Sequence, residues 1–164
     1  MMHSNIDFGG VELATKADED QIFDLLLAMH TEAPVHAFDV EVVRDNIVKG
    51  TEKKGGIIGV IRGPDRLEAT CGLLLSEAAW YTRDLALNSI WTFVHPDHRR
   101  STHAKKLIEF GKICSRWFAQ SGTPVPLQTA VYSEERTEAK CRLHRRQLHP
   151  IGQLFVYRPE AIQG

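Results

Sequence analysis

Cysteines are few in this sequence, and no two of them stand at the spacing of a redox or zinc motif. The 164 residues contain three cysteines, at positions 71, 114 and 141. An odd number of widely separated cysteines does not favour a disulfide framework, and a reduced intracellular protein fits this pattern better.

Long apolar segments are absent as well. No apolar run approaches the length of about 18 residues that a membrane-spanning helix needs. The first residues, MMHSNIDFGG, lack the apolar core of a signal peptide. We therefore expect a cytoplasmic protein with no membrane partner.

An excess of charge of either sign is also missing. The formal net charge is −1 with neutral histidines, while 43% of the residues are hydrophobic and 25% are charged. These values are typical of an ordinary globular domain, so any basic site has to be local. We expect an N-terminal tail at residues 1–10 and a single domain at residues 11–164.

Hydrophobic periodicity predicts a mixture of strands and helices. The expected strands are residues 11–17, 57–61, 67–79, 85–94, 127–132 and 152–157. The expected helices begin at Asp18 and end before Pro34, run over 39–49, extend about five turns from Ala104, and run over 134–148. Short connections predict an antiparallel meander between residues 57 and 94, followed by a right-handed crossover through the third helix. The fold class is therefore α+β or α/β, with helices on both faces of a mixed sheet.

The segment HPDHRRSTHAKKLIEF, residues 95–110, places many cations at the start of an amphipathic helix. A helix N-terminus carries roughly half a positive charge and favours acidic neighbours. A bound anion would remove this conflict, because free backbone N–H groups and the helix dipole both attract it. We therefore interpret the loop at 99–104 as a phosphate or pyrophosphate site. Solvated surface charge explains the same residues equally well.

The same segment resembles the acetyl-CoA-binding motif of the GNAT acyltransferase superfamily. That motif is a strand ending in valine, a proline two residues later, the pattern Q/R-x-x-G-x-G/A, and an apolar helix. Val94, Pro96, Arg99 and Ala104 match it, whereas Thr102 stands where the family usually has glycine. The expected element order over residues 11–159 is similar to the family's fold. The resemblance implies a GNAT-like acyl-CoA N-acyltransferase fold with a mixed, mostly antiparallel sheet of about six or seven strands and about four helices.

The resemblance also implies where the co-substrate acetyl-CoA binds. The backbone of Phe93 and Val94 would pair with the pantetheine arm, and the amides of the following loop would hold the pyrophosphate. Thr102 crowds the phosphate where glycine permits close approach, but the first turn of a helix needs no positive φ and the hydroxyl can add a hydrogen bond. The expected binding residues are Phe93, Val94, Arg99, Arg100, Ser101, Thr102, His103 and Ala104.

In this family the acceptor amine attacks the thioester directly, and proximity contributes up to about 7–11 kcal/mol. Many members protonate the leaving thiolate with a tyrosine on the last helix. His144 stands at that place and is a side chain that can donate a proton, while Tyr132 and Tyr157 are alternatives. The other interpretation of His144 is a surface histidine in a basic helix.

The general base is less evident. The carboxylate that many members place before the motif is Asn88 here, with Ser89 beside it, and neither side chain is a base. Glu32 is a candidate for binding the amine, because its loop lines the acceptor site in the family. An ordinary exposed glutamate, with a water chain as the base, is the alternative.

Neither a metal nor a nucleic acid is expected. His95, His98 and His103 have the spacing H-x2-H-x4-H, which follows no helical face and includes no cysteine. The basic helix at 134–148 lacks the interleaved aromatics of nucleic-acid-binding segments. The aromatic residues Trp80, Tyr81 and Trp91 are expected mostly in the core. For Trp80 and Tyr81, which stand at a strand end, the alternative is that they wall the acceptor pocket.

Two classes of function remain. The first is an N-acetyltransferase that transfers acetyl to a primary amine of a small molecule or peptide, in a protein that can be a homodimer. The second is a non-catalytic protein of the same fold that binds CoA or a partner. The cationic loop favours the first, and the departures at Asn88, Thr102 and His144 favour the second.

Overall fold

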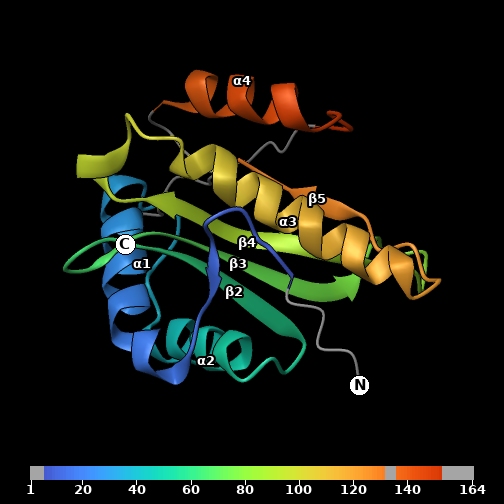
Figure 1. The fold of residues 1–164 in the computed structure, drawn as a ribbon, viewed down its shortest axis with the longest axis horizontal. Coiled ribbons are helices and arrows are strands. Elements are labelled where there is room, and N and C mark those ends of the chain that lie inside the picture. The colour runs from blue at the N-terminus through green and yellow to red at the C-terminus, as the bar shows by residue number, and fades with distance from the viewer. Residues whose placement is uncertain (1–5, 132–135, 153–164) are drawn as a thin grey trace, which may run out of the picture.

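The computed structural model describes residues 6–131 and 136–152. The strands of this part of the chain are β1 (Glu12–Leu13), β2 (Gly56–Arg62), β3 (Leu67–Glu77), β4 (Leu85–Val94) and β5 (Leu127–Thr129). The α-helices are α1 (Glu19–Glu32), α2 (Val40–Thr51), α3 (His103–Gln120) and α4 (Thr137–Gln147), and two short 3-10 helices are η1 (Lys16–Asp18) and η2 (Pro96–His98). Figure 1 shows the helices around one central sheet.

The sheet has the strand order β1-β2-β3-β4-β5, so each strand lies beside its neighbour in the sequence. The first four strands are antiparallel, which confirms the meander, and β5 is parallel to β4 after the crossover through α3. A parallel pair needs a crossover of about a dozen residues or more, and α3 supplies it between β4 and β5, whereas the short links from β2 to β3 and from β3 to β4 join antiparallel strands.

Helices cover both faces of the sheet, as predicted. On one face Phe110, Leu107 and Cys114 of α3 pack against the β3 side chains Cys71 and Leu73. On the other face the buried residues of α1 and α2, which are Ile22, Leu25, Leu26 and Ile47, pack against β2 and β4. Trp91, 8% exposed, belongs to this second core, as expected. The two cores hold the sheet in place between the helices.

The structure corrects several predicted boundaries. The described residues form five strands rather than six or seven, and the predicted strand 152–157 lies almost wholly outside them. The predicted strand 11–17 is reduced to β1, because Thr15 and Asp18 form a capping box that starts η1. Within the expected tail, Phe8 packs against Phe110 with ring centroids 5.1 Å apart. The order of elements was nevertheless predicted along the described chain.

Two features of β4 shape the region near α3. The register of β4 against β3 shifts at Gly72 and Leu73, so Ile90 is an extra, bulged residue. As a result Ser89 and Thr92 turn to the same side, and their hydroxyl oxygens are 3.1 Å apart. Beyond Ser89, β4 has no β5 partner among the described residues.

None of the helices in the described residues is long and apolar enough to cross a membrane.

Candidate functional site

The start of α3 follows directly from the end of β4. Pro96 opens η2, and the ring nitrogen Nδ1 of His95 accepts a hydrogen bond from the backbone N–H of Asp97, which holds the turn. The loop at 99–102 then leads into α3, whose first residue is His103. Proline is favoured at this helical position because its missing N–H would have no partner there anyway.

Several backbone N–H groups of this loop have no hydrogen-bond partner within the described chain. Ser101 N–H donates to the His98 carbonyl, and His103 N–H donates to the Ser101 hydroxyl. The unpartnered groups are the N–H of Arg100, Thr102, Ala104 and Lys105. Free amides at a helix N-terminus form an anion-binding cradle, so the geometry fits the predicted phosphate site.

Thr102 occupies the position of the family's glycine without strain. Its φ is −87° and its ψ is 7°, so the backbone needs no positive φ here. Its hydroxyl makes no capping hydrogen bond, and the residue is exposed. A ligand can therefore reach both the hydroxyl and the backbone N–H.

Two arginines near the cradle pair with acidic side chains that are far from them in the sequence. Both carboxylate oxygens of Glu32, the last residue of α1, accept hydrogen bonds from Arg99. Arg66 donates to Asp97 over 2.7 Å. The positive charge at the start of α3 is thus partly compensated within the protein, as the surface-charge interpretation requires. Glu32 is also engaged, so it is not a free carboxylate for an amine.

Glu68 lies between two histidines. Its Oε2 is 2.6 Å from His103 Nε2 and 3.6 Å from His98 Nδ1. The hydrogen bond from His103 holds the pKa of Glu68 below its usual range, assisted by the charges of His98 and Arg66 and opposed by burial. Sequence analysis missed Glu68, although a single charged residue inside the apolar run LEATCG was a visible signal.

The opening between β4 and β5 is a small pocket beside α3. Ser89, Thr92 and Thr129 supply its hydroxyls, and Cys71, Ile108 and Leu127 supply part of its apolar lining. Phe93 and Val94 lie on the part of β4 that has no β5 partner within the described residues, as a strand-like ligand requires. Burial raises the pKa of the Cys71 thiol well above its usual range and that of Cys114 to about 12, so neither thiol is a nucleophile.

The predicted catalytic side chains make separate contacts. Asn88 donates to the hydroxyl of Ser76 over 2.8 Å, on β3. His144 Nδ1 is 2.8 Å from the Lys140 carbonyl of its own helix, and α4 lies alongside α3 (Figure 1). Glu32 pairs with Arg99. The described contacts therefore do not join the three predicted residues, and the alternatives Tyr132 and Tyr157 lie outside the described residues.

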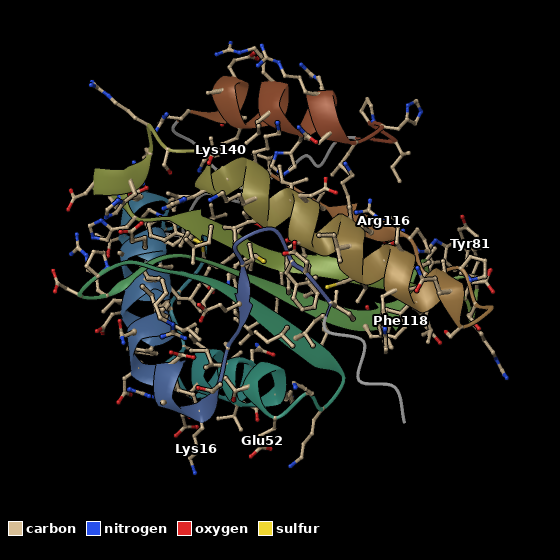
Figure 2. The ribbon with its side chains drawn as sticks, viewed as in Figure 1. Lys16, Glu52, Tyr81, Arg116, Phe118 and Lys140 are labelled. Carbon is tan, nitrogen blue, oxygen red and sulfur yellow. The ribbon has the colours of Figure 1, made fainter. Side chains whose placement is uncertain are left out.

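Two aromatic residues expected in the core are instead on the surface. Trp80 is 93% exposed and Tyr81 is 76% exposed, and their rings pack edge to face. Figure 2 labels Tyr81 on the same side of the view as the end of α3. The loop between β3 and β4 carries both residues outward, so they lie away from the start of α3.

No protein-family model and no curated protein matches the sequence. Solved structures do match. A possible acetyltransferase from Clostridium difficile 630 is 14% identical, with 92% of this chain and 97% of that chain covered and a TM-score of 0.66. The same values hold for AAC(6')-Iy in complex with the bisubstrate analogue CoA-S-monomethyl-acetylneamine.

An aminoglycoside antibiotic 6'-N-acetyltransferase from Acinetobacter haemolyticus is 15% identical, with 93% and 99% of the two chains covered and a TM-score of 0.63. The chain has the GNAT acetyltransferase fold. The unpartnered N–H groups lie in the loop between β4 and α3, and the assignment of the acetyl-CoA phosphates to this loop stays a prediction.

Proposed function

We propose that this protein is an N-acetyltransferase that transfers acetyl from acetyl-CoA to a primary amine of a small molecule or peptide. The observation that carries the proposal is the set of four N–H groups at the start of α3 that have no partner among the described residues. They lie next to the end of β4, which pairs with β3 on one side and has no β5 partner on the other within the same residues. Such a cradle suits a pyrophosphate, and an unpaired strand edge suits the amide groups of pantetheine.

The residues of the loop would divide the binding between them. The N–H groups of Arg100, Thr102, Ala104 and Lys105 would hold the pyrophosphate, with the exposed Arg100 and Lys105 side chains adding charge. Ser101 and His103 shape the turn through their mutual hydrogen bond. Arg99 contacts Glu32 through Nη2, so the carboxylate partly neutralises the charge that Arg99 would offer to a phosphate.

The chemistry needs few side chains. The amine nitrogen attacks the thioester carbon, the C–S bond breaks, and the thiolate takes up a proton. In neutral His144 the Nδ1 proton is donated to the Lys140 carbonyl, which leaves Nε2 without a proton. His144 therefore serves as the acid only as an imidazolium, and water remains the candidate base.

A specific observation favours the second class of function as well. Asn88 is not a base and bonds to Ser76, while Glu32 is occupied by Arg99. A protein that binds CoA without transferring acetyl would retain the cradle and lack these groups. Both classes of function predict CoA binding, but only the transferase predicts turnover.

The test has two stages. Acetyl-CoA and desulfo-CoA should both raise the melting temperature, because a ligand that binds only the folded state stabilises it. Thiol release from acetyl-CoA is then followed with a panel of amines that includes an aminoglycoside and a peptide with a free N-terminus. Acceptor-dependent release supports the transferase, and binding without release supports the non-catalytic protein. A melting curve that millimolar CoA leaves unchanged would refute both.

A further inference from the structure

We propose that Glu68, His98 and His103 form a binding site for a divalent transition metal such as Zn²⁺, beside the anion cradle. The three side chains come from β3, η2 and the first residue of α3. Each offers one ligand atom, and these atoms all lie within 4.8 Å of one another. Two imidazoles and one carboxylate are a ligand set that zinc accepts, with a fourth position left for water or another anion.

The distances are close to those of a coordinated ion. Zinc binds imidazole nitrogen and carboxylate oxygen at about 2.0–2.1 Å, so donor atoms in a tetrahedral site lie roughly 3.3 Å apart. Glu68 Oε2 is 3.6 Å from His98 Nδ1 and 2.6 Å from His103 Nε2. All three ligand atoms lie within 4.8 Å of one another, so movements of the side chains alone would convert the present hydrogen-bonded cluster into a coordination site.

The backbone directs Glu68 into this position. Ile61 pairs with Ala69 and Arg62 pairs with Leu67, so Glu68 is an extra residue in β3 with no partner on β2. Gly63 leaves room for its carboxylate, because a Cβ at Gly63 would lie 2.2 Å from Glu68 Oε1. The bulge and this close approach together place the carboxylate against the two histidines.

The charges around the cluster leave it open to a cation. The nearby guanidinium groups of Arg66 and Arg99 are paired with Asp97 and Glu32. Among the described residues, Glu68 has no lysine or arginine within ion-pair distance, and its close partners are histidines that can lose a proton. With neutral histidines the cluster carries one negative charge and little exposed surface, its side chains being 13–30% exposed.

His103 uses only part of its hydrogen-bonding capacity in the present arrangement. Its Nδ1 atom is buried and has no hydrogen-bond partner in the part of the chain that the structure describes. Because Nε2 is the ring nitrogen that faces Glu68, the unpartnered Nδ1 lies on the other side of the ring, where a bound water would satisfy it, and the metal proposal does not depend on it. The H-x2-H-x4-H triplet is not the ligand set, because His95 turns to Asp97 instead and Glu68 takes its place.

The experiment measures binding of the metal alone, without CoA or an acceptor, so its outcome is independent of the transferase proposal. Untagged protein is freed of metal with a chelator and titrated with Zn²⁺ against a chromophoric competitor. We expect one Zn²⁺ per chain, and no comparable binding of Mg²⁺, which prefers oxygen ligands. Cobalt(II) should give the visible absorption of a four-coordinate site.

Two variants each remove one ligand, and a third is the control. Glu68→Gln and His98→Gln should weaken Zn²⁺ binding more than tenfold, and circular dichroism checks that they fold. His95→Ala removes the neighbouring histidine outside the cluster and should bind like the wild type. If the wild type binds no stoichiometric Zn²⁺, or if both ligand variants bind as tightly as it does, the cluster is an ion pair only and the proposal fails.

Discussion

The starts of helices α2 and α3 are built in opposite ways. At α2 the carboxylate of Asp39 accepts hydrogen bonds from the N–H groups of Glu41 and Val42, and Glu41 adds an acid to the first turn. At α3 the preceding Thr102 makes no capping hydrogen bond, and the first turn contains no acid. At α2 a residue of the same segment accepts hydrogen bonds from the N–H groups of the first turn, whereas at α3 such N–H donors stay available to a ligand.

Helix α1 shows a third arrangement, in which the acid at the helix start is buried. Asp18 accepts hydrogen bonds from the backbone and side chain of Thr15 and from Arg62 of β2. Its side chain is only 3% exposed. At α1 and α2 an acid that is local to the helix start therefore stabilises the fold. At α3 the acid Glu32 comes from a distant segment and leaves the backbone N–H donors available to a ligand.

The largest expected effect is the loss of the buried acid at α1. Asp18→Ala should lower the free energy of unfolding by about 2–3 kcal/mol, because it removes a charged hydrogen-bond acceptor with several partners. Urea denaturation measures this change. Asp20→Ala is the matched control, since Asp20 is exposed and pairs only with the exposed Arg44, and it should change stability by less than about 0.5 kcal/mol. Equal effects of the two substitutions would contradict the comparison.

The same acid predicts a dependence on pH. The hydrogen bond from Arg62, opposed by burial, lowers the pKa of Asp18 in the folded protein. Its contribution is then complete above the unfolded pKa of about 3.9 and is lost as the pH falls through the folded pKa. The stability difference between wild type and Asp18→Asn should therefore be constant near pH 7 and shrink below about pH 4. A difference that grows on acidification would show the opposite sign.

At α3, charge reversal should act on ligand binding. Arg99→Glu should weaken CoA binding by about tenfold or more, equivalent to about 1.4 kcal/mol, because it adds an anion beside the cradle. Titration calorimetry measures the affinity. Since the substitution also faces Glu32 with a like charge, the unliganded fold should lose some stability. Unchanged CoA affinity would count against the cradle.

The next largest effect is a difference in stability between substitutions at the N-caps of α2 and α3. Asp39→Ala should cost about 1 kcal/mol of stability, since it removes the acceptor of two backbone N–H groups. Thr102→Ala should cost only a few tenths, because its hydroxyl makes no cap bond. Thermal denaturation of the two variants shows the contrast. A loss at Thr102 as large as that at Asp39 would mean that both helix starts are capped alike.

The smallest effect is expected from the ion pair that covers the cradle. Glu32→Gln should tighten CoA binding a few-fold, because the substitution removes the carboxylate that neutralises Arg99 beside the cradle. Its cost in stability should stay below about 1 kcal/mol, as for other partly exposed ion pairs. Calorimetry measures the change in CoA affinity. Weaker binding in the variant would show that Glu32 itself supports the cofactor loop.

Local patterns determined most of the fold. The boundaries of β4 were predicted to the residue, and α2 follows from its Asp39 cap and apolar periodicity. The short length of β1 was not predicted, because a capping box over residues 15–18 ends the strand in spite of the alternating pattern. Trp80 and Tyr81 were misplaced because composition does not show whether a loop turns inward or outward.

The sequence by itself determined the element order, the meander and the cation-rich start of α3, because each depends on residues that are neighbours along the chain. Only the tertiary structure decided which acids meet those cations. Glu32 reaches Arg99 across 67 positions, and Glu68 reaches His103 across 35 positions. Such pairs form because the packing of α1 and of β3 beside α3 brings the side chains together. A local sequence pattern cannot predict a contact between residues so far apart along the chain.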